Sequence, residues 1–227
     1  MSANHSLNLL PGEELVPLDR ALYLPNHQAL LVSDLHLGKA ETFQLAGIPV
    51  AQQVNGETLE RLRSHCHTVK PQKIIILGDL FHSRQGLVSE VIAAWAQFLE
   101  DINARVTLIV GNHDRAARGP KFAMEYSTRP IPLGKLLLSH EPVDSDRNFP
   151  KDHLNICGHV HPVVKLQSAV DRLRLPCFYH EHSFQRLTLP SFGSFTGGYE
   201  VTISKHQTAY LSIEGNLIVL DQALYSS

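Results

Sequence analysis

The chain has 227 residues, and 43% of them are hydrophobic. This length and composition fit one domain with a sizeable core and exclude a disordered chain. The formal net charge of −2 excludes a strongly basic nucleic-acid coat, although it permits a basic rim around a local site.

Cysteine usage and hydropathy bear on the cellular compartment. The three cysteines are scattered and form no CxxC pair, which indicates a reducing environment without a disulfide framework. Residues 1–30 lack the basic start and apolar run of a signal peptide. No apolar stretch approaches the roughly 20 residues of a membrane helix. We therefore expect a cytoplasmic protein in which residues 1–227 form a single domain.

The first part of the chain predicts a β-hairpin. Residues 14–24 (ELVPLDRALYL) alternate roughly as a strand does, and residues 28–33 (QALLVS) form a buried strand. Pro25-Asn26 between them is typical of a turn. Two strands joined by a tight turn make a hairpin.

Helices and strands alternate after this hairpin. Helical spacing of apolar side chains predicts helices over residues 54–69 and 88–102. Continuous apolar runs predict strands over residues 73–77 and 105–110. Such an order is typical of a parallel α/β sheet, in which sites lie at the carboxyl ends of the strands.

The second half of the chain is predicted to be mostly β. Short apolar strands are expected at residues 135–138 and 154–157, and residues 162–227 form a β-rich C-terminal part. Within it we expect a strand pair around residues 199–204 and 209–220. Because helices become rare here, the chain predicts two packed sheets with outer helices.

Five short polar motifs lie at or just after the ends of these apolar runs. In chain order they are Asp34-x-His36, Gly78-Asp79, Gly111-Asn112-His113-Asp114, Ser139-His140 and Gly158-His159-x-His161. They offer carboxylates, a carboxamide and imidazoles but no thiolate, a set that suits Mn, Fe or Zn. Two such ions clamp both the attacking and the leaving oxygen of a phosphate ester. The motifs therefore predict a two-metal hydrolytic site.

The spacing within the motifs suggests individual roles. Asp34 and His36 are two residues apart, so at a strand end both can reach one metal ion. Asp79 follows a glycine that lets the backbone turn sharply, which suits a carboxylate that bridges two ions. His113 is a candidate general acid for the leaving oxygen, and Asp114 a candidate partner that holds its ring in one tautomer. The expected nucleophile is a hydroxide that bridges the two metals.

The motifs DxH, GD, GNHD, H and GHxH resemble, in this order, the pattern of the calcineurin-like metallophosphoesterase superfamily over residues 34–161. The resemblance implies a four-layer α/β/β/α sandwich of two mixed sheets flanked by helices, the metallo-dependent phosphatase fold. It implies two divalent metal ions, for which we expect Mn²⁺, with Fe or Zn as alternatives. One ion would be held by Asp34, His36, Asp79 and His161. The other would be held by Asp79, Asn112, His140 and His159.

Finer features resemble particular branches of this superfamily. Residues 78–82 (GDLFH) resemble the Mre11/SbcD nucleases, in which a histidine such as His82 follows the bridging aspartate. Residues 34–40, 47–50 and 189–198 resemble the small bacterial phosphoesterases described as ligase-associated DNA damage response endonucleases. This resemblance implies a DNA endonuclease in repair, associated with a DNA ligase and a Lhr-like helicase.

Other side chains have two readings. His82 either orients a diester substrate or caps the loop after its strand. Lys39, Arg84 and Arg115 each follow a metal motif, so they are candidate ligands of phosphate oxygens, but such loop charges are as often simply solvated. Residues 193–198 either cradle a nucleic-acid backbone or form a tight crossing between strands.

Three functions remain open at this point. The first is a two-metal phosphodiesterase acting on DNA, with His113, Asp114 and His82 as catalytic residues. The second is hydrolysis of a nucleotide, a cyclic nucleotide or a phosphomonoester. The third is a non-catalytic scaffold, which the complete set of candidate ligands disfavours. Metal content separates the scaffold from the enzymes, and the salt dependence of binding separates the two substrate classes.

Overall fold

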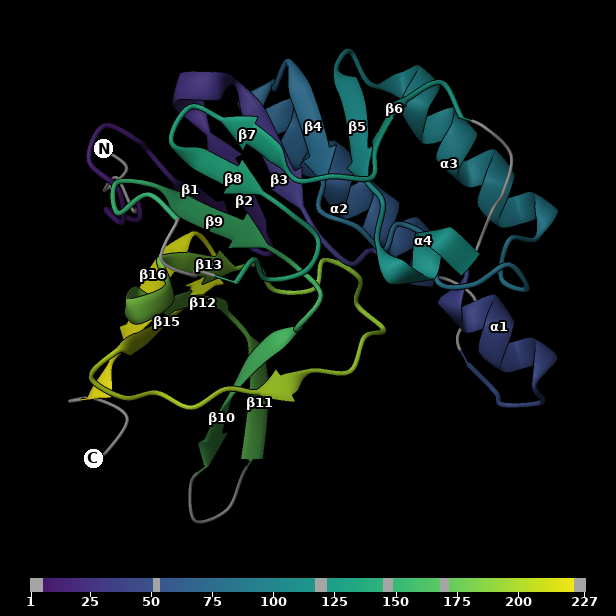
Figure 1. The fold of residues 1–227 in the computed structure, drawn as a ribbon. Coiled ribbons are helices and arrows are strands. Elements are labelled where there is room, and N and C mark those ends of the chain that lie inside the picture. The colour runs from purple at the N-terminus through teal and green to yellow at the C-terminus, as the bar shows by residue number, and fades with distance from the viewer. Residues whose placement is uncertain (1–5, 51–53, 117–121, 145–148, 168–171, 223–227) are drawn as a thin grey trace.

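The computed structural model describes most of the chain, namely residues 6–50, 54–116, 122–144, 149–167 and 172–222. Two β-sheets pack face to face, and two long helices cover the outer face of the first sheet (Figure 1). The predicted mixed α/β metallophosphatase-type fold is confirmed. None of the helices in the described ranges is long and apolar enough to cross a membrane.

The first sheet has the strand order β1-β2-β3-β4-β5-β6. Its strands are β1 (Val16–Leu18), β2 (Ala21–Leu24), β3 (Ala29–Val32), β4 (Lys73–Ile76), β5 (Arg105–Ile109) and β6 (Glu125–Ser127). Strands β3 to β6 are parallel, as the alternation of strands and helices predicts. The hairpin of β2 and β3, joined by the 3-10 turn η1 (Pro25–His27), is also confirmed.

The prediction of one strand over residues 14–24 is wrong. The chain reverses at Asp19, whose φ is 52°, and β1 pairs antiparallel with β2. Aspartate tolerates this left-handed conformation better than most residues. The reversal makes Arg20 part of a turn rather than of a strand.

The long helices α2 (Val54–Val69) and α3 (Ser89–Asp101) match their predicted ranges closely. Trp95 and Phe98 of α3 are fully buried against the side chains of β3, β4 and β5 that point outward. Neighbouring residues of these strands point to the second sheet instead, as the period of a strand requires. Two short helices, α1 (Lys39–Leu45) and α4 (Asn112–Ala116), lie at the carboxyl ends of β3 and β5.

The second sheet has the order β16-β15-β12-β13-β9-β8-β7. Its strands are β7 (Ile131–Leu133), β8 (Leu136–Leu138), β9 (Leu154–Cys157), β12 (Phe178–Glu181), β13 (Arg186–Thr188), β15 (Gln207–Ile213) and β16 (Asn216–Leu220). A 3-10 turn, η2 (His182–Phe184), joins β12 to β13. Strands β8, β9 and β13 are parallel to one another, and their inner side chains pack on the first sheet.

A small third sheet contains β10 (Pro162–Gln167), β11 (Arg172–Pro176) and β14 (Tyr199–Glu200). The predicted pairing of residues 199–204 with 209–220 is therefore wrong, because β14 pairs in parallel with β10. Residues 209–220 instead contain their own hairpin of β15 and β16. Its turn residues Glu214 and Gly215 have φ values of 50° and 77°, which suits a two-residue hairpin loop.

The outer face of the second sheet is covered by β structure within the described residues. Val164 of β10 and Val201 pack against Tyr179 and Leu211, which point outward from the second sheet. Within the described ranges, the α-helices end at or before Ala116. The fourth layer expected from the family resemblance is therefore built here from β10 and residues 201–203 rather than from a helix.

Candidate metal centre

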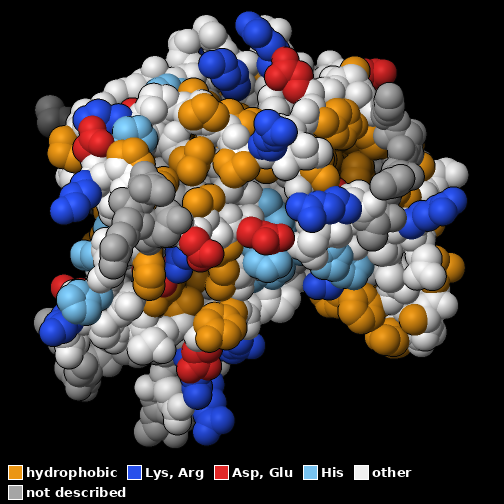
Figure 2. All heavy atoms as spheres, viewed as in Figure 1, with side chains coloured by type: hydrophobic (Ala, Val, Ile, Leu, Met, Phe, Trp, Pro, Cys, Tyr) orange, Lys and Arg blue, Asp and Glu red, His pale blue; other side chains and the backbone are white. Residues whose placement is uncertain are grey.

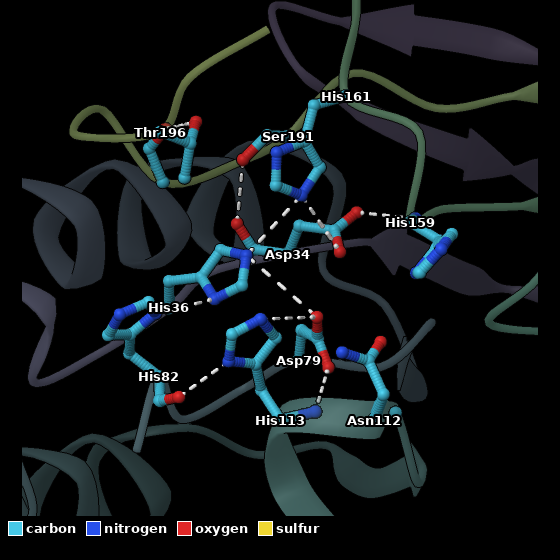
Figure 3. A network of polar contacts seen from close by, with 12 residues as sticks. Asp34, His36, Asp79, His82, Asn112, His113, His159, His161, Ser191 and Thr196 are labelled. Carbon is cyan, nitrogen blue, oxygen red and sulfur yellow. Dashed lines mark hydrogen bonds and ion pairs between the residues drawn. The ribbon is translucent and has the colours of Figure 1, made fainter. Parts of the chain in front are cut away.

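The five polar motifs meet at one end of the two packed sheets. Each follows the carboxyl end of a strand, which is β3, β4 or β5 in the first sheet and β8 or β9 in the second. Because both sets of strands end on the same side, their polar side chains converge (Figure 3). Figure 2 shows histidine side chains gathered near the middle of this face, with Lys, Arg and a few acidic side chains around them. The seven predicted ligands are linked by successive short contacts.

One group of candidate ligands contains Asp34, His36 and His161. The Nε2 atom of His161 lies 3.2 Å from Asp34 Oδ1 and 3.3 Å from His36 Nε2. Two ring nitrogens that bind one tetrahedral ion at about 2.1 Å are about 3.4 Å apart. The observed separation of the two nitrogens therefore fits a shared metal ion.

A second group contains Asp79, His140 and His159. His140 Nε2 lies 3.2 Å from His159 Nδ1 and 2.9 Å from Asn112 Oδ1. Asp79 lies between the two groups, since its Oδ1 is 3.5 Å from His140 Nε2 and its Oδ2 is 3.9 Å from His36 Nε2. The two oxygens of one carboxylate thus face different groups, which is the arrangement that a bridging ligand needs.

Backbone carbonyls set the tautomers of two of these histidines. His140 Nδ1 is 2.8 Å from Leu77 O, and His161 Nδ1 is 3.2 Å from Gly197 O. A carbonyl only accepts, so each Nδ1 carries hydrogen and each Nε2 is left to bind a proton or a metal ion.

One of the two carboxylate oxygens of Asp34 accepts hydrogen bonds, and the other does not. Its Oδ2 accepts from the Ser33 hydroxyl and, at 3.0 Å, from the His159 backbone N–H. Its Oδ1 is buried without a hydrogen-bond partner and faces His161 Nε2. Burial lowers the pKa of His161, but Asp34 outweighs it and raises that pKa overall. A cation between the two groups, either a proton or a metal ion, satisfies both.

Burial also acts on the other ligands. It raises the pKa of Asp79, and the negative charge of Asp34 adds to this effect while His140 opposes it. It lowers the pKa of His36 to about 3, so this imidazole is neutral at pH 7. A neutral imidazole can donate its lone pair to a metal, and two buried carboxylates that repel each other favour a bound cation. The residues present therefore fit divalent metal ions.

The backbone of the site is strained. Asp34, His36, Asp79, His159 and His161 have φ values of 54°, 49°, 53°, 69° and 54°. Non-glycine residues rarely adopt this region, and such strain concentrates at functional sites. Hydrogen bonds hold it in place, since the N–H groups of Asp34 and His36 donate to the backbone oxygens of Gly78 and Asp79 at 3.1 and 2.9 Å.

The glycine before Asp79 is required by close packing as well as by conformation. Gly78 has a φ of 83°, and a Cβ atom there would overlap the ring of His140. Contact between the loop after β4 and a ligand from the second sheet therefore depends on this glycine.

His113 is oriented by a backbone group. Its Nδ1 donates to His82 O at 2.7 Å, and its Nε2 lies 4.0 Å from Asp79 Oδ2. The ring is partly exposed, so Nε2 can face both the metal ligands and a bound substrate. This placement is compatible with the predicted role of general acid.

The predicted role of Asp114 as the partner of the His113 ring is wrong. Asp114 Oδ2 instead accepts the backbone N–H groups of Asp79 and Gly111 at 2.8 and 3.0 Å, and its Oδ1 accepts that of Phe81 at 3.1 Å. Asp114 therefore ties together the loops after β4 and β5. Neighbouring residues in the sequence did not become partners because the helical turn of α4 directs their side chains differently.

We expect Asp114→Ala to destabilise the protein by about 2–4 kcal/mol, because three partly buried N–H groups lose their acceptor. Urea unfolding in the presence of a chelator measures this loss without a contribution from bound metal. Asp152→Ala, at an exposed aspartate, is the matched control and should unfold as the wild type does. Unchanged stability of Asp114→Ala would contradict the role of Asp114 in tying the two loops together.

His82 lies beside the first group of ligands. Its ring stacks on that of His113 with centroids 4.9 Å apart, and its Nδ1 is 3.4 Å from His36 Nδ1. Burial lowers the pKa of His82 to about 4. Phe43 of α1 also stacks with the His82 ring, with centroids 6.3 Å apart, and it contacts Phe195 edge-to-face. His82 is therefore part of the site rather than a distant loop cap.

The three predicted phosphate ligands differ in their positions. Lys39 lies close enough to affect the pKa values of His36 and His82, and its own pKa is lowered by burial. Arg115 lines a cavity that also contains His140. The side chain of Arg84 is exposed, and within the described residues no hydrogen bond or ion pair joins it to the candidate ligands.

Several supporting residues were missed by the sequence analysis. The Ser191 hydroxyl donates to Asp34 O at 2.8 Å, and Gly193 N–H donates to the same oxygen at 3.1 Å. The loop containing Ser191 and Gly193 follows β13 and lies 157 residues from Asp34 in the chain. No local spacing could reveal this contact, although the resemblance at residues 189–198 marked the segment itself.

Comparisons with known proteins agree with this geometry. The profile described as calcineurin-like phosphoesterase matches residues 27–204. The crystal structure of Pseudomonas putida nuclease MPE is 34% identical, has a TM-score of 0.77, and the match covers 93% of this chain and 97% of that one. The phosphoesterase Yfce from E. coli is 17% identical with a TM-score of 0.41, over 85% of this chain and 92% of that one. No curated protein matches. A family match over most of the chain and a similar nuclease structure show that this protein is a metal-dependent phosphoesterase and belongs to the calcineurin-like phosphoesterase family.

Proposed function

We propose that the protein is a two-metal phosphodiesterase that cleaves DNA as an endonuclease. The observation that carries this proposal is the position of Asp79, whose two oxygens face two separate groups of ligands. We assign one ion to Asp34, His36, Asp79 and His161, and the other to Asp79, Asn112, His140 and His159. Two bound divalent ions would activate water and stabilise the charge that develops on the phosphate.

The residues around these ligands have their own tasks in the proposal. His113 holds a proton at Nε2 and transfers it to the leaving oxygen, while the His82 carbonyl keeps its ring in one orientation. The His82 side chain and Lys39 orient the phosphate group. Lys39 suits this task because it keeps a positive charge close to the ligand histidines.

Two observations support DNA as the substrate. The structure with 34% identity is that of a protein named as a nuclease. In addition, Phe43 and Phe195 form an aromatic pair beside His82, with Lys39 Nζ 5.8 Å from the Phe195 ring centroid. Aromatic side chains next to a positive charge suit stacked bases and a phosphate backbone. We also propose Mn²⁺ as the metal, a cytoplasmic location, and a repair role with a DNA ligase and a Lhr-like helicase as partners.

Mn²⁺-dependent cleavage of supercoiled and single-stranded DNA tests this function. We expect the wild type to nick or cut both, with activity that falls steeply as salt rises, and the Asp79→Asn protein to be inactive. Cleavage by Asp79→Asn at the wild-type rate would contradict the two-metal assignment.

The second candidate is hydrolysis of a small phosphate compound. The weak overall charge is compatible with it, and it becomes the conclusion if metal-loaded protein hydrolyses nucleotides or p-nitrophenyl phosphates but leaves DNA intact. The scaffold function would require a protein that binds no Mn, Fe or Zn and hydrolyses none of these substrates.

A further inference from the structure

A cavity of about 210 Å³ lies beside the metal centre and shares His161 with it as a wall. Its other lining residues come from four parts of the chain: the turn after β1, strands β10 and β11, and the loop after β13. The polar side chains among them are Arg20, Arg174, Ser191, Ser194 and Thr196. Figure 3 shows Thr196 on the loop that passes beside His161. A water molecule occupies about 30 Å³ in the liquid, so the cavity has room for a phosphate group and part of its hydration.

The two arginines supply positive charge at this cavity. Arg20 Nη1 donates to Gly193 O at 3.1 Å, and Arg174 Nη2 donates to Gly198 O at 2.6 Å. A guanidinium has five N–H donors, so each side chain retains further donors. Within the part of the chain that the structure describes, neither forms an ion pair with a carboxylate; the adjacent Asp19 pairs with Arg61 instead.

Ser194 adds a neutral donor to the lining of the same cavity. Arg61 Nη1 donates to its Oγ at 3.3 Å, which leaves the hydroxyl hydrogen available for another acceptor. Two unpaired guanidiniums and a hydroxyl around one cavity suit an anion with several oxygens, such as a phosphate diester.

The same loop connects the cavity to the metal ligands. Gly197 O accepts from His161 Nδ1, and Gly193 N–H donates to Asp34 O. His161 lines the cavity and also belongs to the first group of ligands. An anion in the cavity and a phosphate at the metals would therefore be close neighbours.

We propose that this cavity binds the phosphate next to the scissile one on the same nucleic-acid strand, through Arg20, Arg174 and Ser194. The inference rests on the proposed function, because it needs a substrate with consecutive phosphates. It predicts that the protein distinguishes polynucleotides from compounds with one phosphate. Arg20 contributes only because the chain reverses at Asp19, so the turn that replaces the predicted long strand has a function.

The test compares substrates that differ by one phosphate. Dithymidine with a single internal phosphate is compared with its 5′- and 3′-phosphorylated forms, using metal-loaded wild type, Arg20→Ala and Arg174→Ala. In the wild type, we expect one phosphorylated form to have a lower KM than dithymidine. Each substitution should raise the KM for that form about tenfold. The kcat for bis-(p-nitrophenyl) phosphate, which has one phosphate, should change less than twofold in both variants.

Control variants separate binding from loop positioning. Arg105→Ala removes an exposed arginine at the start of β5, whereas the metal motif follows the end of that strand. This variant should keep the full KM advantage of the phosphorylated form. Arg20→Lys and Arg174→Lys retain charge and one donor for the loop carbonyl, so they should recover part of it. If the arginines only positioned the loop, the variants would lose kcat for bis-(p-nitrophenyl) phosphate and metal content together with the KM advantage of the phosphorylated form. That result would overturn the proposal.

The proposed function and this inference can fail separately. If the wild type cleaves dithymidine but extra phosphates bring no gain, the DNA phosphodiesterase stands and the phosphate cavity is wrong. If the wild type cleaves only small esters, the three dithymidine compounds are measured as inhibitors of bis-(p-nitrophenyl) phosphate hydrolysis. Tighter inhibition by one phosphorylated form, lost in the arginine variants, then supports the cavity without DNA cleavage, and equal inhibition overturns it.

Discussion

Asp79→Asn is expected to lose bound metal and more than about 100-fold in turnover, because even groups that only support a metal ligand contribute roughly 10- to 100-fold. Asp79 faces both groups of ligands, so its loss should affect both ions. Asparagine tolerates the left-handed backbone at this position, so the fold should persist. Elemental analysis of purified protein and steady-state kinetics measure the two effects.

The same variant should change stability in a direction that depends on metal and pH. Burial raises the pKa of Asp79 in the folded protein. In metal-free protein, Asp79 therefore stabilises the fold at pH values below the pKa that it has in the unfolded chain. This stabilisation is lost as the pH rises through the higher pKa of the folded protein. Asparagine does not titrate. With a chelator present, Asp79→Asn should therefore be at least as stable as the wild type at pH 8. With Mn²⁺ added, the wild type should become the more stable protein.

Asp152→Asn provides the matched control for this experiment, since Asp152 is exposed and distant from the metal ligands. It should retain metal content, turnover and thermal stability. Near-normal turnover in Asp79→Asn would reject the bridging role, and a protein with metal but no turnover would restrict that role to catalysis.

His113→Gln is expected to keep metal and to lose about 10²- to 10⁴-fold in kcat for substrates with poor leaving groups. His113 is not one of the seven assigned ligands, and its ring only packs edge-to-face against that of His36 with centroids 4.9 Å apart. Its Nδ1 donates to His82 O and its Nε2 faces Asp79 from 4.0 Å. Proton transfer matters most when the leaving alkoxide is basic. The loss should therefore be small for p-nitrophenyl esters and large for nucleoside esters.

A series of leaving groups with increasing pKa measures this dependence, as the slope of log kcat against leaving-group pKa. His67→Gln, at an exposed histidine of α2, should keep the wild-type slope. A loss in His113→Gln that is the same for every leaving group would contradict the role of general acid and point to substrate positioning.

Local sequence patterns determined the parallel half of the fold and the identity of the metal-ligand candidates. Continuous apolar runs and helical periods depend on residues close in the chain, so β3, β4, β5, α2 and α3 lie near their predicted ranges. Each polar motif directly follows such a run. The motifs therefore had to lie at strand ends once the strands formed.

Turns and short strands were less predictable. The reversal at Asp19 and the pairing of β14 with β10 involve two or three residues with little periodicity of their own. Their structure depends on which neighbouring strand offers free hydrogen-bonding groups. For the same reason, residues 199–204 did not pair with the strand that follows them.

The sequence by itself determined which side chains could bind two metals, because those residue types follow the apolar runs that become strands. Only the tertiary structure decided how they meet. Packing of the two sheets brings His140, His159 and His161 against Asp34 and Asp79. It also gives Asp114 its backbone partners and places Arg20 beside the loop after β13. Contacts of this kind depend on distance and direction in space. Neither the composition nor the spacing of residues along the chain gives that information.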